Sequence, residues 1–146
     1  MKRQILFRGK AAPQCSWIYG EYVTTDETPK IYERRNGETR ACWDYKVDPE
    51  TVGEFTGMFD ACGQRIFEDD ITRVYYEGKD YIGMIQYDAF GVFIFVARGF
   101  GWIPLYQLQC EQDTEKIARG EKATLKNIRV IGNIHENASY LEDNKK

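Results

Sequence analysis

The apolar residues of this chain come in short runs, most of them separated by turn-forming polar residues. In residues 17–23 the apolar side chains of Trp17, Tyr19 and Val23 fall on alternate positions, which is the period of a β-strand. Asn36-Gly37 between charged residues predicts a hairpin turn, and Asp48-Pro49 predicts the start of a one-turn helix. The strands predicted in the first part of the chain are residues 3–8, 17–23, 31–34 and 39–47, and residues 51–58 lead into the next turn.

The middle of the chain carries the most regular pattern. Asp60 heads a turn in which Gly63 supplies a positive φ, and the apolar pair at residues 66–67 follows. Three strands are then predicted at residues 71–76, 81–87 and 92–97. Turns at residues 77–80 and 88–91 join them. Consecutive strands with short connections are typical of a β-meander, the unit of sandwiches and small barrels. The last strand is apolar on both faces, which places it centrally in a sheet or at an interface.

Strand and helix signals alternate towards the C-terminus. Residues 103–105 close the sheet region, and residues 128–134 form another strand. Residues 111–120 are the one plausible internal helix, with Gly120 suited to its C-terminal end. Asn137 can cap a last short helix.

These elements predict a mainly β fold with one or two short helices. We expect a single compact domain, residues 1–146, built around the β-meander or a partly open small barrel. Its core spans residues 49–137. Residues 1–48 form an N-terminal part, and loose attachment of this part to the core is left open. The charged tail, residues 142–146, is expected to fray.

Composition narrows the class of protein without identifying a function. Hydrophobic residues make up 42% and charged residues 29%, as in an ordinary globular protein, and the aromatic share of 14% favours strands. The net charge of −3 gives no global attraction to nucleic acid or to an anionic membrane. The apolar runs at residues 5–7 and 92–97 are too short for a signal peptide or for the roughly 20 residues of a membrane helix. We therefore expect a cytoplasmic protein without membrane contact.

Cysteine and histidine positions show no metal-binding or catalytic spacing. Zinc ligands usually come as close pairs, whereas the four cysteines are scattered without a CxxC pair. The only histidine, His135, has no Ser, Cys or Asp partner at an interpretable spacing. We expect reduced, mostly structural thiols at Cys15, Cys42, Cys62 and Cys110. No residue is assigned a catalytic, cofactor-binding or metal-binding role.

Four carboxylates in the middle of the chain are the best candidates for a metal site, since hard divalent ions bind several oxygens. They are Asp60, Glu68, Asp69 and Asp70. An Asp at the head of a turn or at the entry to a strand also accepts hydrogen bonds from loop N–H groups. Two-metal sites usually recruit His or further carboxylates as well, so we favour the structural interpretation. A metal-dependent hydrolase is the least favoured of three alternative functions.

Aromatic and basic residues in the same region form a candidate binding surface. Tyr75 and Trp102, with Arg73 and Arg98, have the chemistry to stack on and neutralise a single strand of nucleic acid. Acidic residues such as Asp80 interleave with these cations, and burial in a core or a subunit interface is the simpler use of aromatic side chains. A nucleic-acid-binding small barrel is therefore the second alternative.

Three blocks of the chain match a known pattern. Residues 51–60 read T-V-G-E-F-T-G-M-F-D and continue to residues 68–71, E-D-D-I, while residues 130–137 read V-I-G-N-I-H-E-N. Together with residues 5–10 and 17–20 they resemble the YopX family of phage and prophage proteins, whose patterns are T-V-G-x-[FY]-T-G-L-x-D-x-x-G-x-x-I-[FY]-E-G-D-I-V and V-I-G-N-I-[YH]-E-N-P. The signature positions, to which we assign structural roles, are Thr51, Gly53, Thr56, Gly57, Asp60, Gly63, Asp70, Gly132, Asn133 and Asn137.

Two positions depart from the family pattern. Asp69 stands where the family usually has Gly, so a turn that tolerates positive φ carries a side chain here. Asp adopts such a conformation at low cost, and the fold is expected to survive. Ala138 stands where the family usually has Pro after Asn137. Ala also suits the first position of a helix.

The resemblance implies a mainly β fold, a phage or prophage origin and an uncharacterised activity, with no cofactor or substrate. We interpret the chain as a non-catalytic accessory protein that acts by binding, first of all to another protein. The two-sided apolar strand at residues 92–97 and the aromatic excess also favour a homo-oligomer.

Overall fold

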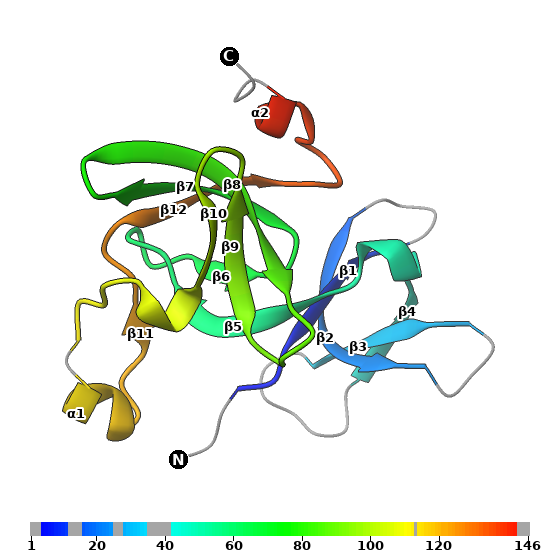
Figure 1. Ribbon diagram of the computed structural model, residues 1–146. Coiled ribbons are helices and arrows are strands. Elements are labelled where there is room, and N and C mark those ends of the chain that lie inside the picture. The colour runs from blue at the N-terminus through cyan, green and yellow to red at the C-terminus, as the bar shows by residue number, and fades with distance from the viewer. Residues whose placement is uncertain (1–3, 12–15, 25–27, 35–41, 113, 143–146) are drawn as a thin grey trace. The chain divides into compact units, whose positions relative to one another are not determined.

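The computed structural model describes residues 4–11, 16–24, 28–34, 42–112 and 114–142, with the backbone alone at residues 34, 42–44 and 114 (Figure 1). The chain divides into an N-terminal unit, residues 4–55, and a C-terminal unit that begins at Thr56. The single domain over residues 1–146, with its core at 49–137, stays a prediction. Within the described residues no helix is long and apolar enough to cross a membrane.

The N-terminal unit is an antiparallel sheet in the order β5-β1-β2-β3-β4. The first residues of β5 pair with β1 in this unit, and its last four belong to the C-terminal unit. Ala11, Ile18, Ile31 and Val47 form the unit's small core. Its elements are β1 (Phe7–Lys10), β2 (Trp17–Val23), β3 (Lys30–Arg34), β4 (Cys42–Lys46), the 3₁₀ turn η1 (Pro49–Thr51) and β5 (Gly53–Phe59).

Several sequence predictions can be checked in this unit. The strand at residues 17–23 is confirmed, and so is the short helix after Asp48, whose carboxylate accepts a hydrogen bond from the backbone of Glu50. The first strand was predicted too early, because pairing with β2 begins at Phe7 and runs to Lys10. The Asn36-Gly37 turn lies outside the described residues.

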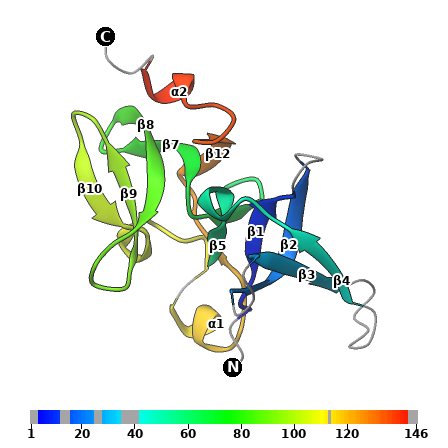
Figure 2. The same cartoon turned by 90° about the vertical axis from the view of Figure 1, so that its right-hand side faces the viewer.

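The C-terminal unit is built on a five-stranded antiparallel sheet in the order β10-β9-β8-β7-β12 (Figure 2). Beside it, the end of β5 pairs with β6 and, in parallel, with β11. The elements of this unit after β5 are β6 (Arg65–Phe67), β7 (Asp70–Tyr76), β8 (Lys79–Tyr87), β9 (Phe93–Ala97), β10 (Gly101–Pro104), the 3₁₀ turn η2 (Leu105–Gln107), α1 (Thr114–Ala118), β11 (Ala123–Thr124), β12 (Ile128–Asn133) and α2 (Ser139–Glu142).

One face of the five-stranded sheet, which we call the inner face, packs on the core of the unit. Every strand of the sheet contributes at least one buried apolar residue to it: Val74, Ile85, Phe95, Ile103 and Ile128, with Ala97 as a second residue from β9. Leu105, Leu108 and Leu125 reach this core from the segments beside the sheet. Because strand side chains alternate, the residues that flank these five positions point to the opposite, outer face.

The predicted mainly β fold and its meander are confirmed, and the sheets do not close into a barrel. The turn predicted over residues 77–80 is tighter than expected. Glu77 and Gly78 both have positive φ, 48° and 84°, as in the two-residue turns that suit the twist of a hairpin. The strand at residues 92–97 is interior to the sheet, between β8 and β10. The helix predicted over residues 111–120 is α1, which is shorter.

Candidate binding surface

The carboxylate of Asp60 is fully engaged by the backbone. Only 1% of the residue is exposed. Its Oδ1 accepts hydrogen bonds from the N–H groups of Cys62 and Gln64, both at 2.9 Å, and its Oδ2 accepts one from Val130 at 3.0 Å. A single side chain thus holds the turn after β5 to β12, as the structural interpretation of the sequence expected. Three hydrogen bonds and almost complete burial leave this carboxylate little capacity to bind a metal ion.

The acidic pair Asp69 and Asp70 also serves the chain's own turns. Oδ2 of buried Asp70 accepts a hydrogen bond from the backbone of Phe67 at 2.7 Å. Asp69 has a φ of 73°, which confirms the positive φ expected where the family has Gly. Among the side chains that the structure describes, no group of three or more His, Cys, Asp or Glu residues is placed to hold a metal ion.

His135 has an acidic partner that sequence reasoning missed. Its Nε2 lies 3.2 Å from Oδ2 of Asp69, and both side chains are largely shielded from solvent. The contact joins the turn before β7 to the segment after β12, which are distant along the chain. No spacing in the sequence signals this pair, because it depends on how β7 and β12 come together.

The closing motif forms a compact turn of its own. Asn133 Oδ1 accepts hydrogen bonds from the backbone of His135 and Glu136, at 3.0 and 3.1 Å. Asn137 Oδ1 accepts one from the backbone of Asn133 at 3.2 Å. A Cβ at Gly132 would overlap the Asn137 side chain, lying 2.7 Å from its Cγ. The motif therefore redirects the chain from β12 towards α2.

The remaining signature positions hold turns and strand ends in place. The hydroxyl of Thr51 donates to Asp48 O and accepts from the backbone of Lys10. The hydroxyl of Thr56 donates to Ile66 O at 2.8 Å. Gly57 and Gly63 have positive φ, at 85° and 82°, and Gly53 pairs with Arg8 where β5 meets β1.

The four residues of the predicted binding surface share the outer face of the five-stranded sheet. Arg73 and Tyr75 flank the core residue Val74, and Trp102 precedes the core residue Ile103. Arg98 follows Ala97 at the end of β9. All four are exposed, Tyr75 to 52% and Trp102 to 64%. They do not form one cluster, because β8 and β9 separate β7 from β10.

The short helix α2 covers the middle of this outer face, as both Figure 1 and Figure 2 show. Ala138 and Leu141 line a hollow of about 390 Å³ together with Ile82, Met84 and Val96 of the sheet. Arg98 lies at the same hollow. The apolar outer side of β9 is therefore partly covered by the chain itself.

Arg73 and Tyr75 lie in a second hollow, of about 300 Å³, at the edge of the sheet. Arg129 and Lys126 also line it, and sequence reasoning did not select either of them. Arg129 lies directly opposite Arg73 in the pairing of β12 with β7. The available signal was the alternation in the predicted strand 128–134, which turns Arg129 away from the buried Ile128.

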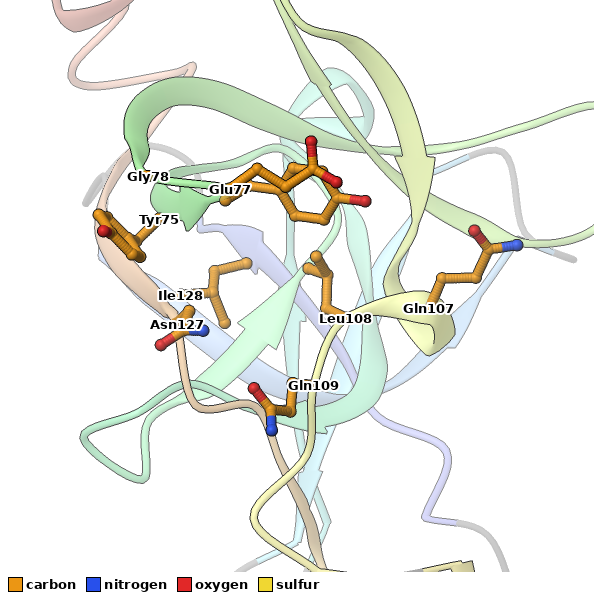
Figure 3. Close-up of a pocket in the computed structure, with 9 residues that line it drawn as sticks. Tyr75, Glu77, Gly78, Gln107, Leu108, Gln109, Asn127 and Ile128 are labelled. Atoms are coloured by element: carbon orange, nitrogen blue, oxygen red, sulfur yellow. The ribbon is translucent and has the colours of Figure 1, made fainter.

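A third hollow, of about 330 Å³, is drawn in Figure 3 and shares Tyr75 with the second. Figure 3 shows Leu108 and Ile128 in its middle. The rim carries amide and carboxylate side chains that are free to meet a ligand: Glu77, Gln107, Gln109 and Asn127. Tyr75, Asn127 and Ile128 belong to both hollows.

The turn between β8 and β9 presents the most exposed aromatic side chain described. Asp88 Oδ1 accepts hydrogen bonds from the backbone of Phe90 at 2.9 Å and of Val92 at 3.1 Å. Asp88 N donates to Val92 O, and Gly91 N donates to Asp88 O. This closed network holds Phe90 at 93% exposure.

The described cysteine side chains, Cys62 and Cys110, are free thiols. Burial raises the pKa of the Cys110 thiol above its ordinary value, so it carries less thiolate at neutral pH. Cys62 is exposed. The side chains of Cys15 and Cys42 lie outside the described part of the chain.

Comparison with known proteins places this arrangement in a family. The family described as YopX protein matches residues 6–142, nearly the whole chain. The chain belongs to the YopX family. A search of curated proteins finds no match.

The YopX signature positions are thus explained by structure. The hydrogen bonds of Asp60, Asp70, Asn133 and Asn137 hold turns, and none of these side chains lines the three hollows. The features open to a ligand in this YopX-family chain lie elsewhere, on the outer face, at the amide-rimmed hollow and at the β8–β9 turn.

Proposed function

We propose that this YopX-family chain is a non-catalytic accessory protein that docks onto another protein through the turn between β8 and β9. The observation that carries the proposal is Phe90, which is 93% exposed on a turn closed by Asp88. A large apolar side chain on the surface costs solvation free energy, and a partner's pocket relieves that cost. Aromatic anchors of this kind contribute most of the binding energy at protein interfaces.

The geometry of the turn favours tight docking. Since Asp88 already fixes the backbone from residue 88 to residue 92, little conformational entropy remains to be lost on binding. Tyr87 is exposed beside it and contacts Phe93, with ring centroids 5.0 Å apart. Burying Phe90 alone supplies about 2–3 kcal/mol. Tyr87 extends the apolar contact at the edge of the same surface.

Three of the four carboxylates that could have supported hydrolysis contact other groups of the chain, which supports a role without catalysis. Asp60 binds three backbone N–H groups, and Asp70 binds the backbone of Phe67. Asp69 faces His135.

The proposal extends to origin and assembly. A phage or prophage protein that acts in the cytoplasm of a bacterial host accords with the family. A second copy of the chain is one partner that Phe90 could bind. The earlier argument for a homo-oligomer, the two-sided apolar strand at residues 92–97, is weaker now because Leu141 and Ala138 partly cover Val96.

A pull-down from bacterial lysate tests this function. Tagged wild-type protein, Phe90→Ser and the control Tyr106→Ser, which changes another exposed aromatic residue, are compared after nuclease treatment. We expect a defined protein to be recovered by the wild type and the control and lost with Phe90→Ser. Equal recovery by all three would contradict docking through this turn. Sedimentation velocity of the same three proteins shows whether the partner is a second copy.

A further inference from the structure

We propose that the surface around Tyr75, where the cationic hollow of the outer face meets the amide-rimmed hollow beside the core, is a binding site for single-stranded nucleic acid, separate from the β8–β9 turn. Three observations meet there: a group of unneutralised cations, an exposed aromatic ring, and a hollow rimmed with amides. None of them involves Phe90, so this site and the proposed protein docking stand or fall separately.

A group of cations lies beside Tyr75. Arg73, Arg129 and Lys126 line one hollow of about 300 Å³, and all three are exposed. In the part of the chain that the structure describes, their side chains form no ion pair or hydrogen bond. Among the described residues that line this hollow, Asp80 is the only acidic one. A chain with a net charge of −3 thus concentrates positive charge at one place.

The pairing of Arg73 with Arg129 costs stability in the absence of a ligand. Like charges directly opposite each other in neighbouring strands repel. An anion between them would remove that repulsion and form charge-assisted hydrogen bonds with both guanidinium groups. Phosphate groups are the anions that arginine recognises best, because its planar donors match their oxygens.

The aromatic ring distinguishes nucleic acid from a simple acidic partner. Tyr75 neighbours Arg73 on the same face of β7 and is 52% exposed between the cationic hollow and the amide-rimmed one. Unpaired bases stack on such rings while the backbone follows the cations. An acidic peptide would use the cations alone and leave Tyr75 without a role.

The amide-rimmed hollow supplies the remaining chemistry. Gln107, Gln109 and Asn127 each offer a donor and an acceptor, and Glu77 offers an acceptor. These groups match the hydrogen-bonding edges of bases. In a duplex these edges are paired inside the helix, so the arrangement favours a single strand. Leu108 and Ile128 give the hollow an apolar floor.

Fluorescence anisotropy with labelled oligonucleotides tests the site. The probes are a DNA strand and an RNA strand of the same mixed sequence, about ten nucleotides long, and the matching duplex. Contacts from three cations predict that log affinity falls with log salt at a slope of about −2. Arg129→Gln should flatten that slope by about 0.7. Tyr75→Leu should weaken binding about tenfold with an unchanged slope.

Arg119→Gln is the matched control, because it removes the same charge from the residue that follows α1, where Arg119 pairs with Glu115 of the helix. Figure 1 and Figure 2 both show α1 at the opposite end of the unit from the β7–β8 hairpin. We expect this control to bind like the wild type, and both single strands to bind more tightly than the duplex. Tighter binding of the RNA strand would identify the ligand as RNA. Equal affinity for the two strands would mean that the site accepts either RNA or DNA. The proposal is overturned if no probe binds, if Arg129→Gln behaves like Arg119→Gln, or if polyglutamate competes as well as the strands and Tyr75→Leu changes nothing.

Discussion

Arg73 in β7 and Arg129 in β12 stand directly opposite each other in an antiparallel pair of strands. Both side chains are exposed on the outer face, where repulsion between them is only partly screened by water and salt. An arrangement that lowers stability without serving the core is a sign of a binding role.

Replacing one of these arginines should therefore stabilise the protein. We expect Arg129→Gln to raise the free energy of unfolding by about 0.2–0.5 kcal/mol at low salt, because the cross-strand repulsion is lost. Arg119→Gln removes a favourable surface pair and should lower it by about 0.3 kcal/mol. Urea denaturation measures both. A loss of 1 kcal/mol or more for Arg129→Gln would show that Arg129 supports the fold instead.

Asp60 should be among the most sensitive positions of the C-terminal unit. Asp60→Ala leaves three backbone N–H groups without an acceptor and should cost about 3 kcal/mol or more. Asp60→Asn keeps one acceptor oxygen and should cost less. Urea denaturation of the wild type and both variants, with and without added Mg²⁺ or chelator, gives the test. Neither Mg²⁺ nor chelator should change the denaturation midpoint of any of these proteins. Stabilisation of the wild type alone by Mg²⁺ would restore the metal-site interpretation.

Gly132 and Asn137 should be coupled. A methyl group at Gly132 overlaps the Asn137 side chain and breaks the hydrogen bond that it accepts from Asn133. We expect Gly132→Ala to cost about 1–3 kcal/mol in the wild type and clearly less in an Asn137→Ala background. A double-mutant cycle by thermal or urea unfolding measures the difference. Purely additive costs would mean that the two residues do not meet.

The two described thiols should differ in reactivity. The raised pKa of Cys110 means that the thiol stays protonated to higher pH. Its alkylation rate should therefore begin to rise at a higher pH than the rate of an ordinary thiol. Cys62 is exposed and should react first near neutral pH. Timed alkylation with peptide mapping by mass spectrometry separates the sites. Faster labelling of Cys110 in the folded protein would contradict its burial.

Local patterns in the sequence predicted most of the elements. Alternation identified β2, and turn chemistry identified the Glu77-Gly78 hairpin and the helix after Asp48. The family pattern predicted the positive φ of Asp69, because Gly is usual at that position. These features depend only on residues that are neighbours along the chain.

The features that create the surface depend on distant residues and were missed. The register of β12 against β7 brings Arg129 to Arg73, and the same pairing brings His135 to Asp69. Neither strand reveals its partner, because alternation fixes which face a side chain takes but not what it meets. The parallel pairing of β11 with β5 was also missed. β11 has only two residues, which are too few to show an alternation of apolar and polar side chains.

The most direct test of a role in binding is a pull-down that compares wild type, Phe90→Ser and Tyr106→Ser from nuclease-treated lysate. Docking through the β8–β9 turn predicts that a defined protein is recovered with wild type and Tyr106→Ser and disappears with Phe90→Ser. Recovery of that protein with Phe90→Ser at the wild-type level would contradict the account.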